Sequence, residues 1–213
     1  MKHIVLLGDS VFDNQAYVNG GIDVIAHIRR QIPAGWKASL RAVDGSVVEN
    51  VRKQIIDLPD DATHLVVSAG GNDAILNAGI LQQKVASSAE VLDKLADIAG
   101  EFEYRYHEML HGVLGLKKPT AVCTIYYPRI PEPFTQKIAV AALATFNDVI
   151  IRRAFMAGVP LIDLRLVCDE DSDYANEIEP SEKGGGKIAN AIVRLVSEHN
   201  FESHRTEVFI CGR

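Results

Sequence analysis

Short apolar runs alternate along the chain with longer segments of helical periodicity, and this alternation limits the fold more than any other feature. The runs are mostly aliphatic and are bounded by turn residues, as strands buried on both faces are. Helix-periodic segments between such runs are typical of βαβ units and a parallel sheet. Five strands are predicted, at Ile4–Leu7, Ala38–Val43, Leu65–Ser68, Ala121–Ile125 and Leu161–Leu164.

The predicted helices follow from apolar residues three and four positions apart and from the prolines that stop them. The long stretch Leu81–Leu114 contains no proline, and its interior Gly100 indicates a break between two helices. The other predicted helices are Ile22–Ile32, Val47–Ile56, Gln136–Ala157 and Lys187–Glu198.

No linker, repeat or shift in composition divides the 213 residues. We therefore expect one domain over residues 1–200, followed by a tail over residues 201–213. Within the tail, Thr206–Cys211 is compatible with an edge strand, an oligomer contact or a mobile end. The oligomeric state stays open.

The charge and the distribution of apolar residues exclude several classes of protein. With 22 Lys and Arg against 28 Asp and Glu, the formal net charge is −6, which argues against a nucleic-acid partner. No apolar run is long enough to span a membrane, and Met1–Leu7 is too short for a signal peptide. Cys123, Cys168 and Cys211 form no paired motif, so we expect free thiols and a cytoplasmic protein.

Three predicted strands end in polar, glycine-bearing segments. In an open parallel sheet, ligands bind beyond the carboxyl ends of the strands. Glycines there let the backbone approach a ligand, and free N–H groups can face the negative charge that develops in acyl transfer. The three segments are Gly8-Asp9-Ser10, Asp44-Gly45-Ser46 and Gly70-Gly71-Asn72-Asp73.

These segments, in this order after successive strands, resemble the conserved blocks of the SGNH hydrolases, also called GDSL esterases and lipases. The resemblance implies a three-layer α/β/α sandwich of flavodoxin-like topology with a five-stranded parallel sheet. It also implies that Ser10 is the nucleophile and that the Ser10 amide, the Gly45 amide and the Asn72 side chain form the oxyanion hole. A small-molecule ester would be the substrate, without a cofactor.

Weaker similarities extend over most of the chain. Thr124–Pro128 is similar to the family's exit from its fourth strand, and Asp163-Leu164 to its exit from the fifth. Tyr126, Tyr127 and Arg129 are candidates to line a substrate crevice because they follow the fourth strand. For Asp9 the main expectation is structural, since a carboxylate beside Ser10 can hold the turn by hydrogen bonds.

The chain departs from the family where the catalytic histidine belongs. The family carries Asp-x-x-His before its last helix, whereas this chain has Asn176 and Glu179 at the corresponding positions. Glu179-Pro180-Ser181 and the following Gly184-Gly185, together with the start Gly8-Asp9-Ser10-Val11-Phe12-Asp13-Asn14, resemble a bacterial branch that lacks this histidine. We therefore interpret the replacement of the histidine as a feature of that branch and not as an isolated loss.

Three interpretations of the missing histidine follow. Glu179 can act as the base on Ser10, although its reference pKa lies about two units below that of histidine, a handicap of roughly 3 kcal/mol unless burial raises it. A distant histidine, His64 or His199, can reach the site, although both are expected at the wrong end of their elements. The third interpretation is a ligand-binding relative without turnover.

A different motif, His-Glu-x-x-His, occurs at His107, Glu108 and His111. On a helix this spacing places two imidazoles on one face, where they could bind zinc with the glutamate as base. The extended form of the motif is absent, because Leu114 and Lys117 stand where glycine and a third histidine are needed. A zinc metallohydrolase is thus an alternative of lower rank, and we expect no metal.

Overall fold

The computed structural model describes residues 1–210, so Cys211 lies outside the described residues. Six strands form one parallel sheet in the order β2-β1-β3-β4-β5-β6, which extends the flavodoxin-like order by one strand. The strands are β1 (His3–Gly8), β2 (Lys37–Leu40), β3 (His64–Ser68), β4 (Thr120–Cys123), β5 (Leu161–Ile162) and β6 (Val208–Phe209).

The predicted parallel sheet is confirmed, but in residues 1–210 it has six strands, one more than predicted. The additional strand, β6, lies in the segment Thr206–Cys211, for which an edge strand was one of three alternatives. Val208 and Phe209 pair in parallel with Leu161 and Ile162 of β5. Phe209 is buried against the core, whereas Val208 is half exposed. A strand of two residues has too little periodicity to be recognised before its partner is known.

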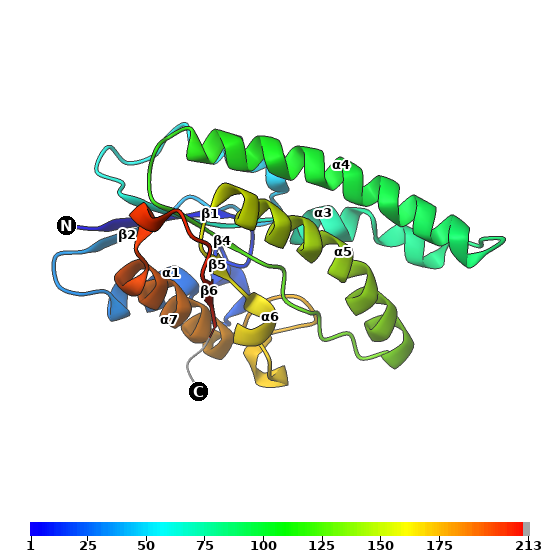
Figure 1. Cartoon of the computed structure of the whole chain (residues 1–213). Helices are drawn as coiled ribbons and strands as arrows, with labels where there is room; N and C mark the ends of the chain where they lie inside the picture. The colour runs from blue at the N-terminus through cyan, green and yellow to red at the C-terminus, as the bar shows by residue number, and fades with distance from the viewer. Residues whose placement is uncertain (211–213) are drawn as a thin grey trace.

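Helices cover both faces of the sheet and give a three-layer α/β/α sandwich (Figure 1). Alternate residues of each strand point to opposite faces, so Ile4 and Leu6 enter one core while Val5 and Leu7 enter the other. Helices α1 (Val24–Gln31) and α7 (Glu182–Glu198) cover the first face. The second face lies under α2 (Val51–Gln54), α4 (Ser88–Leu114) and α5 (Pro133–Ala157).

Helix α4 is a single helix, so the predicted break at Gly100 is wrong. An interior glycine costs a helix roughly 1 kcal/mol. Burial of one face of α4, which includes Phe102, Tyr106 and Met109, outweighs that cost. The helix also begins later than predicted, at Ser88, where the Ser87 side chain accepts a hydrogen bond from the Glu90 N–H.

The residues before α4 form short helices instead. Helix α3 (Gly71–Leu76) follows β3 directly, and the 3-10 helix η3 (Ala78–Gln82) comes next. Two further elements connect β5 to α7, namely α6 (Leu164–Val167) and the 3-10 helix η4 (Asp171–Asp173). The 3-10 helices η1 (Gln15–Tyr17), η2 (Val48–Asn50) and η5 (Phe201–Ser203) lie in other connections. No helix in the described part of the chain is long and apolar enough to cross a membrane.

Candidate active site

Ser10 lies just beyond the carboxyl end of β1, and its position depends on the glycine that ends the strand. Gly8 has φ 127°, and a Cβ there would lie 1.7 Å from the carbonyl oxygen of Ser68 on β3. Only glycine therefore permits this close approach of the two strands. The Gln54 side chain binds both the N–H and the C=O of Gly8, at 2.7 and 2.8 Å.

Asp9 holds the turn that presents Ser10, as expected from the sequence. Its carbonyl oxygen accepts hydrogen bonds from the N–H groups of Phe12 and Asp13, each at 3.1 Å. Its carboxyl oxygen Oδ1 accepts another from the N–H of Val11 at 3.2 Å. The turn is thus fixed by hydrogen bonds on both sides of Ser10.

Ser10 and Glu179 are hydrogen-bonded, although 169 positions separate them in the sequence. The Ser10 hydroxyl Oγ donates to Glu179 Oε1 at 3.0 Å. Only 8% of Ser10 and 6% of Glu179 is exposed. The other carboxyl oxygen of Glu179, Oε2, is buried and has no hydrogen-bond partner among residues 1–210. This geometry satisfies the distance that a general base needs.

Burial raises the pKa of Glu179 from its usual 4.5 to about 7. The hydrogen bond from Ser10 opposes this change, and the negative charge of Asp44 adds to it. A carboxylate that is removed from water binds its proton more tightly. The base strength of Glu179 thereby approaches that of an ordinary histidine.

The backbone around Glu179 is held by side chains from two directions. Oδ1 of Asn176 accepts hydrogen bonds from the N–H groups of Ile178 and Glu179, at 2.9 and 3.0 Å. The buried Tyr126 hydroxyl donates to the Ile178 carbonyl at 2.6 Å. The Ala175 N–H donates to the Glu179 carbonyl at 2.8 Å, which closes the loop on itself.

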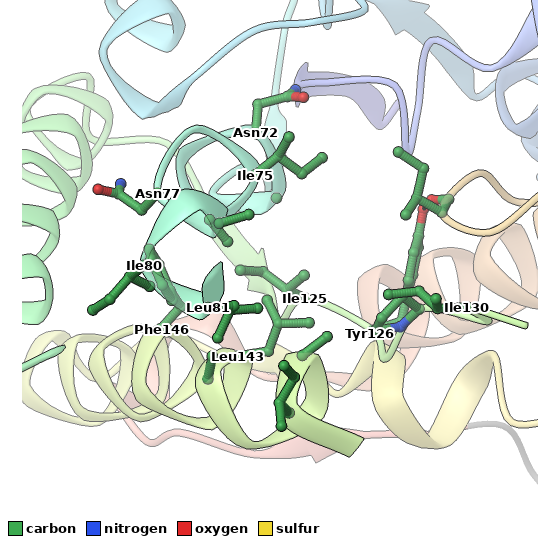
Figure 2. A pocket seen from close by; sticks show the side chains of 18 of the residues that line it. Asn72, Ile75, Asn77, Ile80, Leu81, Ile125, Tyr126, Ile130, Leu143 and Phe146 are labelled. Atoms are coloured by element: carbon green, nitrogen blue, oxygen red, sulfur yellow. The ribbon is translucent and has the colours of Figure 1, made fainter. Parts of the chain in front are cut away.

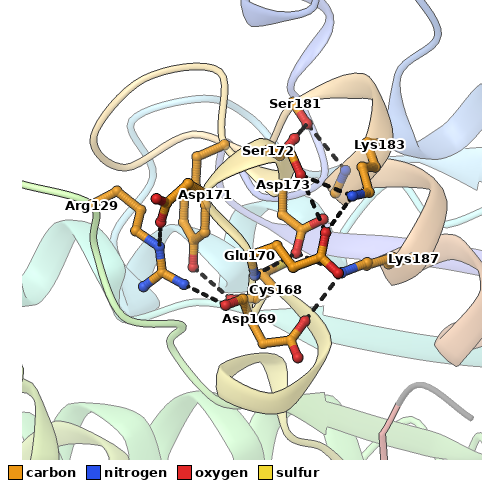
Figure 3. Close-up of polar contacts among 12 residues, drawn as sticks. Arg129, Cys168, Asp169, Glu170, Asp171, Ser172, Asp173, Ser181, Lys183 and Lys187 are labelled. Atoms are coloured by element: carbon orange, nitrogen blue, oxygen red, sulfur yellow. Dashed lines mark hydrogen bonds and ion pairs between the residues drawn. The ribbon is translucent and has the colours of Figure 1, made fainter. Parts of the chain in front are cut away.

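An ion-pair network anchors the start of the same loop to α7 and to the segment after β4 (Figure 3). Asp173 is fully buried, and its Oδ2 lies 2.7 Å from Lys187 Nζ on α7. Lys183, one turn earlier, pairs with the exposed Glu170. Arg129 lies 3.0 Å from Asp171 and donates from its guanidinium to the Asp169 carbonyl at 2.8 Å.

Close packing complements these ion pairs where α7 begins. A Cβ at Gly184 would lie 2.1 Å from the Asp173 carbonyl oxygen, so only glycine lets the loop approach α7 this closely. The Ser181 side chain caps the helix by accepting from the Gly184 N–H at 3.2 Å. The loop that bears Glu179 is therefore fixed at both ends.

Asn72 and Gly45 lie at the neighbouring strand ends. Asn72 opens α3, and its side-chain Nδ2 donates to the Ser46 carbonyl at 2.9 Å. An amide NH₂ has two N–H groups, so one remains for another acceptor. Within residues 1–210, the backbone N–H groups of Ser10 and Gly45 donate no hydrogen bond. These donors come from the ends of β1, β2 and β3.

Two more carboxyl groups of the strand ends, those of Asp9 and Asp73, are buried. Burial raises the pKa of Asp9 to about 8, and the charges of Glu179 and Asp73 add to this increase. Burial also raises the pKa of Asp73, whose Oδ2 accepts from the Val48 N–H at 3.0 Å. Burial at the strand ends therefore favours the neutral form of both carboxyl groups, and the charge of Glu179 acts on Asp9 in the same direction.

Many solved structures share this architecture, and lipases and esterases are among them. A phospholipase A1 from Streptomyces albidoflavus NA297 aligns with a TM-score of 0.65 at 18% identity, over 93% of this chain and 99% of its own. A lipolytic protein of the G-D-S-L family from Veillonella parvula DSM 2008 aligns with a TM-score of 0.68 at 14% identity, over 93% and 100%. A lipase/acylhydrolase from Enterococcus faecalis gives 0.64 at 17% identity, over 100% of both chains.

The chain has the SGNH hydrolase fold. Each of these alignments covers nearly the whole of both chains. No protein-family model and no curated protein matches the sequence itself. The likeness to these proteins is therefore one of fold.

The SGNH hydrolase fold keeps the two candidate histidines away from Ser10. His64 pairs with Ile4, at the opposite end of the sheet from the pairing of Gly8 with Ser68. Burial lowers the pKa of His64 to about 4. His199 follows the last residue of α7, and its Nδ1 lies 2.7 Å from Glu207 Oε2.

The His-Glu-x-x-His motif lies on the outer surface of α4. His107 and His111 are exposed, with ring centroids 6.2 Å apart, and Glu108 lies 3.5 Å from Arg52. Residues 1–210 contain no group of three or more His, Cys, Asp and Glu side chains that could hold a metal ion. The described residues thus supply no third ligand for a zinc site at this motif.

Some residues of the site escaped sequence reasoning. Gln54, which binds Gly8, and Asn147, which binds the N–H and C=O of Ile125 at 2.8 and 2.9 Å, are both buried amides. A polar residue inside an apolar helical stretch, as Asn147 is, is a signal that could have found it. Of the crevice candidates, Tyr126 lines the cavity beside Ser10, whereas Tyr127 and Arg129 do not.

Proposed function

We propose that the protein is a serine acylhydrolase that cleaves a carboxylic ester through an acyl-enzyme on Ser10. The observation that carries the proposal is the 3.0 Å hydrogen bond from the Ser10 hydroxyl to the buried Glu179 carboxylate. The structural neighbours, which include a phospholipase A1 and a lipase/acylhydrolase, support ester cleavage as the class of reaction.

In the first half of the reaction, ionised Glu179 takes the hydroxyl proton while Ser10 Oγ attacks the ester carbonyl carbon. The carbonyl oxygen becomes an oxyanion. When the tetrahedral intermediate collapses, the C–O bond to the alcohol breaks, and Glu179 returns its proton to the departing alkoxide. The acyl group then remains bonded to Ser10.

In the second half, Glu179 acts as a base again and takes a proton from water. The resulting hydroxide attacks the acyl carbon, and a second oxyanion forms. Its collapse releases the carboxylic acid, and the proton on Glu179 passes back to Ser10 Oγ. One water is consumed for each ester cleaved, and the enzyme returns to its starting state.

The backbone N–H groups of Ser10 and Gly45 and the second N–H of Asn72 are the proposed oxyanion donors. Their freedom from other acceptors in residues 1–210 supports this assignment. Donors that are already in place stabilise the oxyanion without reorganisation, and each one typically contributes a factor of about 10²–10³ in kcat.

The raised pKa of Glu179 answers the main objection to a carboxylate base. An ordinary glutamate is about 3 kcal/mol weaker than histidine for this task. With a pKa of about 7, Glu179 is ionised in about half of the molecules at neutral pH and still attracts the serine proton. Glu179 is therefore proposed to do the work of the missing histidine without a third residue acting on its carboxylate.

The test combines a fluorophosphonate probe, which labels activated serines, with p-nitrophenyl acetate and butyrate as substrates. We expect wild type to be labelled and to turn over both esters. Ser10→Ala should abolish labelling and turnover, and Glu179→Gln should lower kcat by about 10²–10⁴-fold while the fold is retained. Circular dichroism checks the fold of each variant.

Ser197→Ala and Glu198→Gln serve as matched controls because both residues are exposed on α7, far along the helix from Glu179. Both controls should keep wild-type turnover. Turnover that survives Ser10→Ala would contradict the serine mechanism. A wild type that neither labels nor hydrolyses either ester would point to a ligand-binding protein instead. The cytoplasmic location stays a prediction.

A further inference from the structure

An apolar cavity of about 400 Å³ opens from Ser10 and Glu179 and extends between η3, α4 and α5. Figure 2 shows Ile75 and Leu81 on one side of this space, Tyr126 and Ile130 on the opposite side, and Leu143 and Phe146 along a third. The volume lies within the range of about 300–1,000 Å³ that is typical of small-molecule sites. The proposed reaction centre is thus the polar end of a largely apolar space.

Helix α5 presents one continuous face to the cavity. The lining residues of this helix recur at helical spacing, three, four or one position apart. They are Phe134, Thr135, Ile138, Ala139, Ala142, Leu143 and Phe146. Two of them are alanines, Ala139 and Ala142, so the middle of this wall carries short side chains and leaves the space open.

Apart from the exposed Gln82, the polar side chains of the lining are concentrated at one end or are already bonded. Ser10, Glu179 and Asn72 lie at the reaction centre. Farther away, Asn77 donates to the Asp73 carbonyl at 2.8 Å, and the Thr135 hydroxyl donates to Glu132 at 2.6 Å. Among the described residues that line the cavity there is no Lys, Arg or His.

The distribution of polar groups in the lining indicates which kind of ligand the cavity can bind. A sugar needs hydrogen-bonding partners along its length, and an anionic group needs a cation. Away from Ser10 the cavity offers no cation, and the single amide of Gln82 does not provide partners along the length of a sugar. A hydrocarbon chain, by contrast, gains free energy from every methylene that it buries there.

We propose that the cavity binds the acyl chain of a medium-chain ester and that Ala139 and Ala142 admit the chain. The proposal rests on the proposed function, because the ester carbonyl must lie at Ser10 for the chain to enter. At about 30 Å³ for a group the size of a water molecule, the cavity of about 400 Å³ has room for about 13 such groups. The ester group at Ser10 takes about three of these places, which leaves room for roughly ten carbons of the chain.

The first experiment measures kcat/KM for p-nitrophenyl esters from acetyl to dodecanoyl. Each methylene that enters the cavity should raise kcat/KM about three- to fourfold. The increase should continue to about the octanoyl or decanoyl ester and then stop. Hydrolysis of the acetyl ester as fast as the octanoyl ester would overturn the proposal while leaving the serine mechanism intact.

The second experiment shortens the cavity with Ala142→Phe. We expect kcat/KM for the octanoyl ester to fall at least 30-fold and that for the acetyl ester to stay within about threefold of wild type. The matched control is Ala144→Phe, because Ala144 is exposed on the same helix and does not line the cavity. An equal loss for both esters in Ala142→Phe would count against an acyl-chain site.

A third experiment measures binding without turnover. It distinguishes failure of the acyl-chain proposal from failure of the proposed serine mechanism. Saturation-transfer NMR with Ser10→Ala protein compares methyl octanoate with methyl acetate. Binding of methyl octanoate that Ala142→Phe abolishes and Ala144→Phe preserves supports the site, even if wild type hydrolyses no ester. Equal signals from the two esters, unaffected by Ala142→Phe, would overturn it.

Discussion

The backbone N–H of Glu179 donates a hydrogen bond of 3.0 Å to the side-chain oxygen of Asn176. By the resemblance described above, Asn176 corresponds to the aspartate that orients the histidine of SGNH hydrolases. In this chain the same position acts on the backbone of the proposed base and leaves its carboxylate untouched. Asn176 is therefore a positioning residue in the proposed mechanism.

Replacement of Asn176 tests this role. Asn176→Ala frees the N–H groups of Ile178 and Glu179, so we expect kcat to fall about 10–100-fold with little change in KM. Asn176→Asp keeps the acceptor and should restore most of kcat, with the midpoint of the pH profile moved upward by the added negative charge. Asn200→Ala, in a loop beyond α7, is the control and should match wild type. A rise in KM without loss of kcat would contradict the assignment.

The pH dependence of activity should follow the ionisation of Glu179. Because the base must be ionised, kcat/KM for p-nitrophenyl butyrate should fall about tenfold per pH unit below an apparent pKa near 7. Asp44→Asn removes a charge that raises this pKa and should move the midpoint to lower pH. The exposed Asp60, which precedes β3, provides the control Asp60→Asn. A midpoint near 4.5 in wild type would exclude a buried glutamate as the base.

The same group should make the fold less stable as the pH rises. The pKa of Glu179 is about 7 in the folded chain and near its usual 4.5 when unfolded, so the folded state binds the proton more tightly. This contribution is fully present below pH 4.5 and is lost as the pH rises through 7, at most about 3 kcal/mol. Wild type should therefore be less stable to urea at pH 8 than at pH 5. Glu179→Gln lacks this group, so its stability should fall less between the two pH values. An equal loss of stability between pH 5 and pH 8 in wild type and in Glu179→Gln would contradict the raised pKa.

The sequence predicted more about the proposed reaction centre than about the edges of the fold. The segments of Ser10, Gly45 and Asn72 stood out because polar, glycine-bearing residues follow three predicted strands, and the family resemblance suggested their roles. Glu179 was found through the family resemblance alone, since nothing near it in the sequence points to Ser10. The apolar cavity was not found, because it depends on how η3 and α5 are spaced across the site, which periodicity does not encode.

The two lysines of α7 that contact the Glu179 loop should differ in their effect on stability. Lys187→Met leaves the fully buried Asp173 without this cation, and we expect a loss of about 3 kcal/mol in the free energy of unfolding. Lys183→Met removes a pair with the exposed Glu170 and should cost less than about 1 kcal/mol. Urea titration of both variants at pH 7 makes the comparison, and equal losses would mean that burial of Asp173 is not decisive.

The contact of Gly8 with Ser68 has a consequence for how such sites change over evolutionary time. Ser10 and Asn72 follow the two adjacent strands that meet in this contact, so the pairing of these strands fixes the distance between the two residues. Glu179 arrives from a separate loop with its own anchors on α7 and Tyr126. The two parts of the proposed reaction centre are therefore held independently, and a change at the position of the proposed base need not alter the strand ends that hold Ser10 and Asn72.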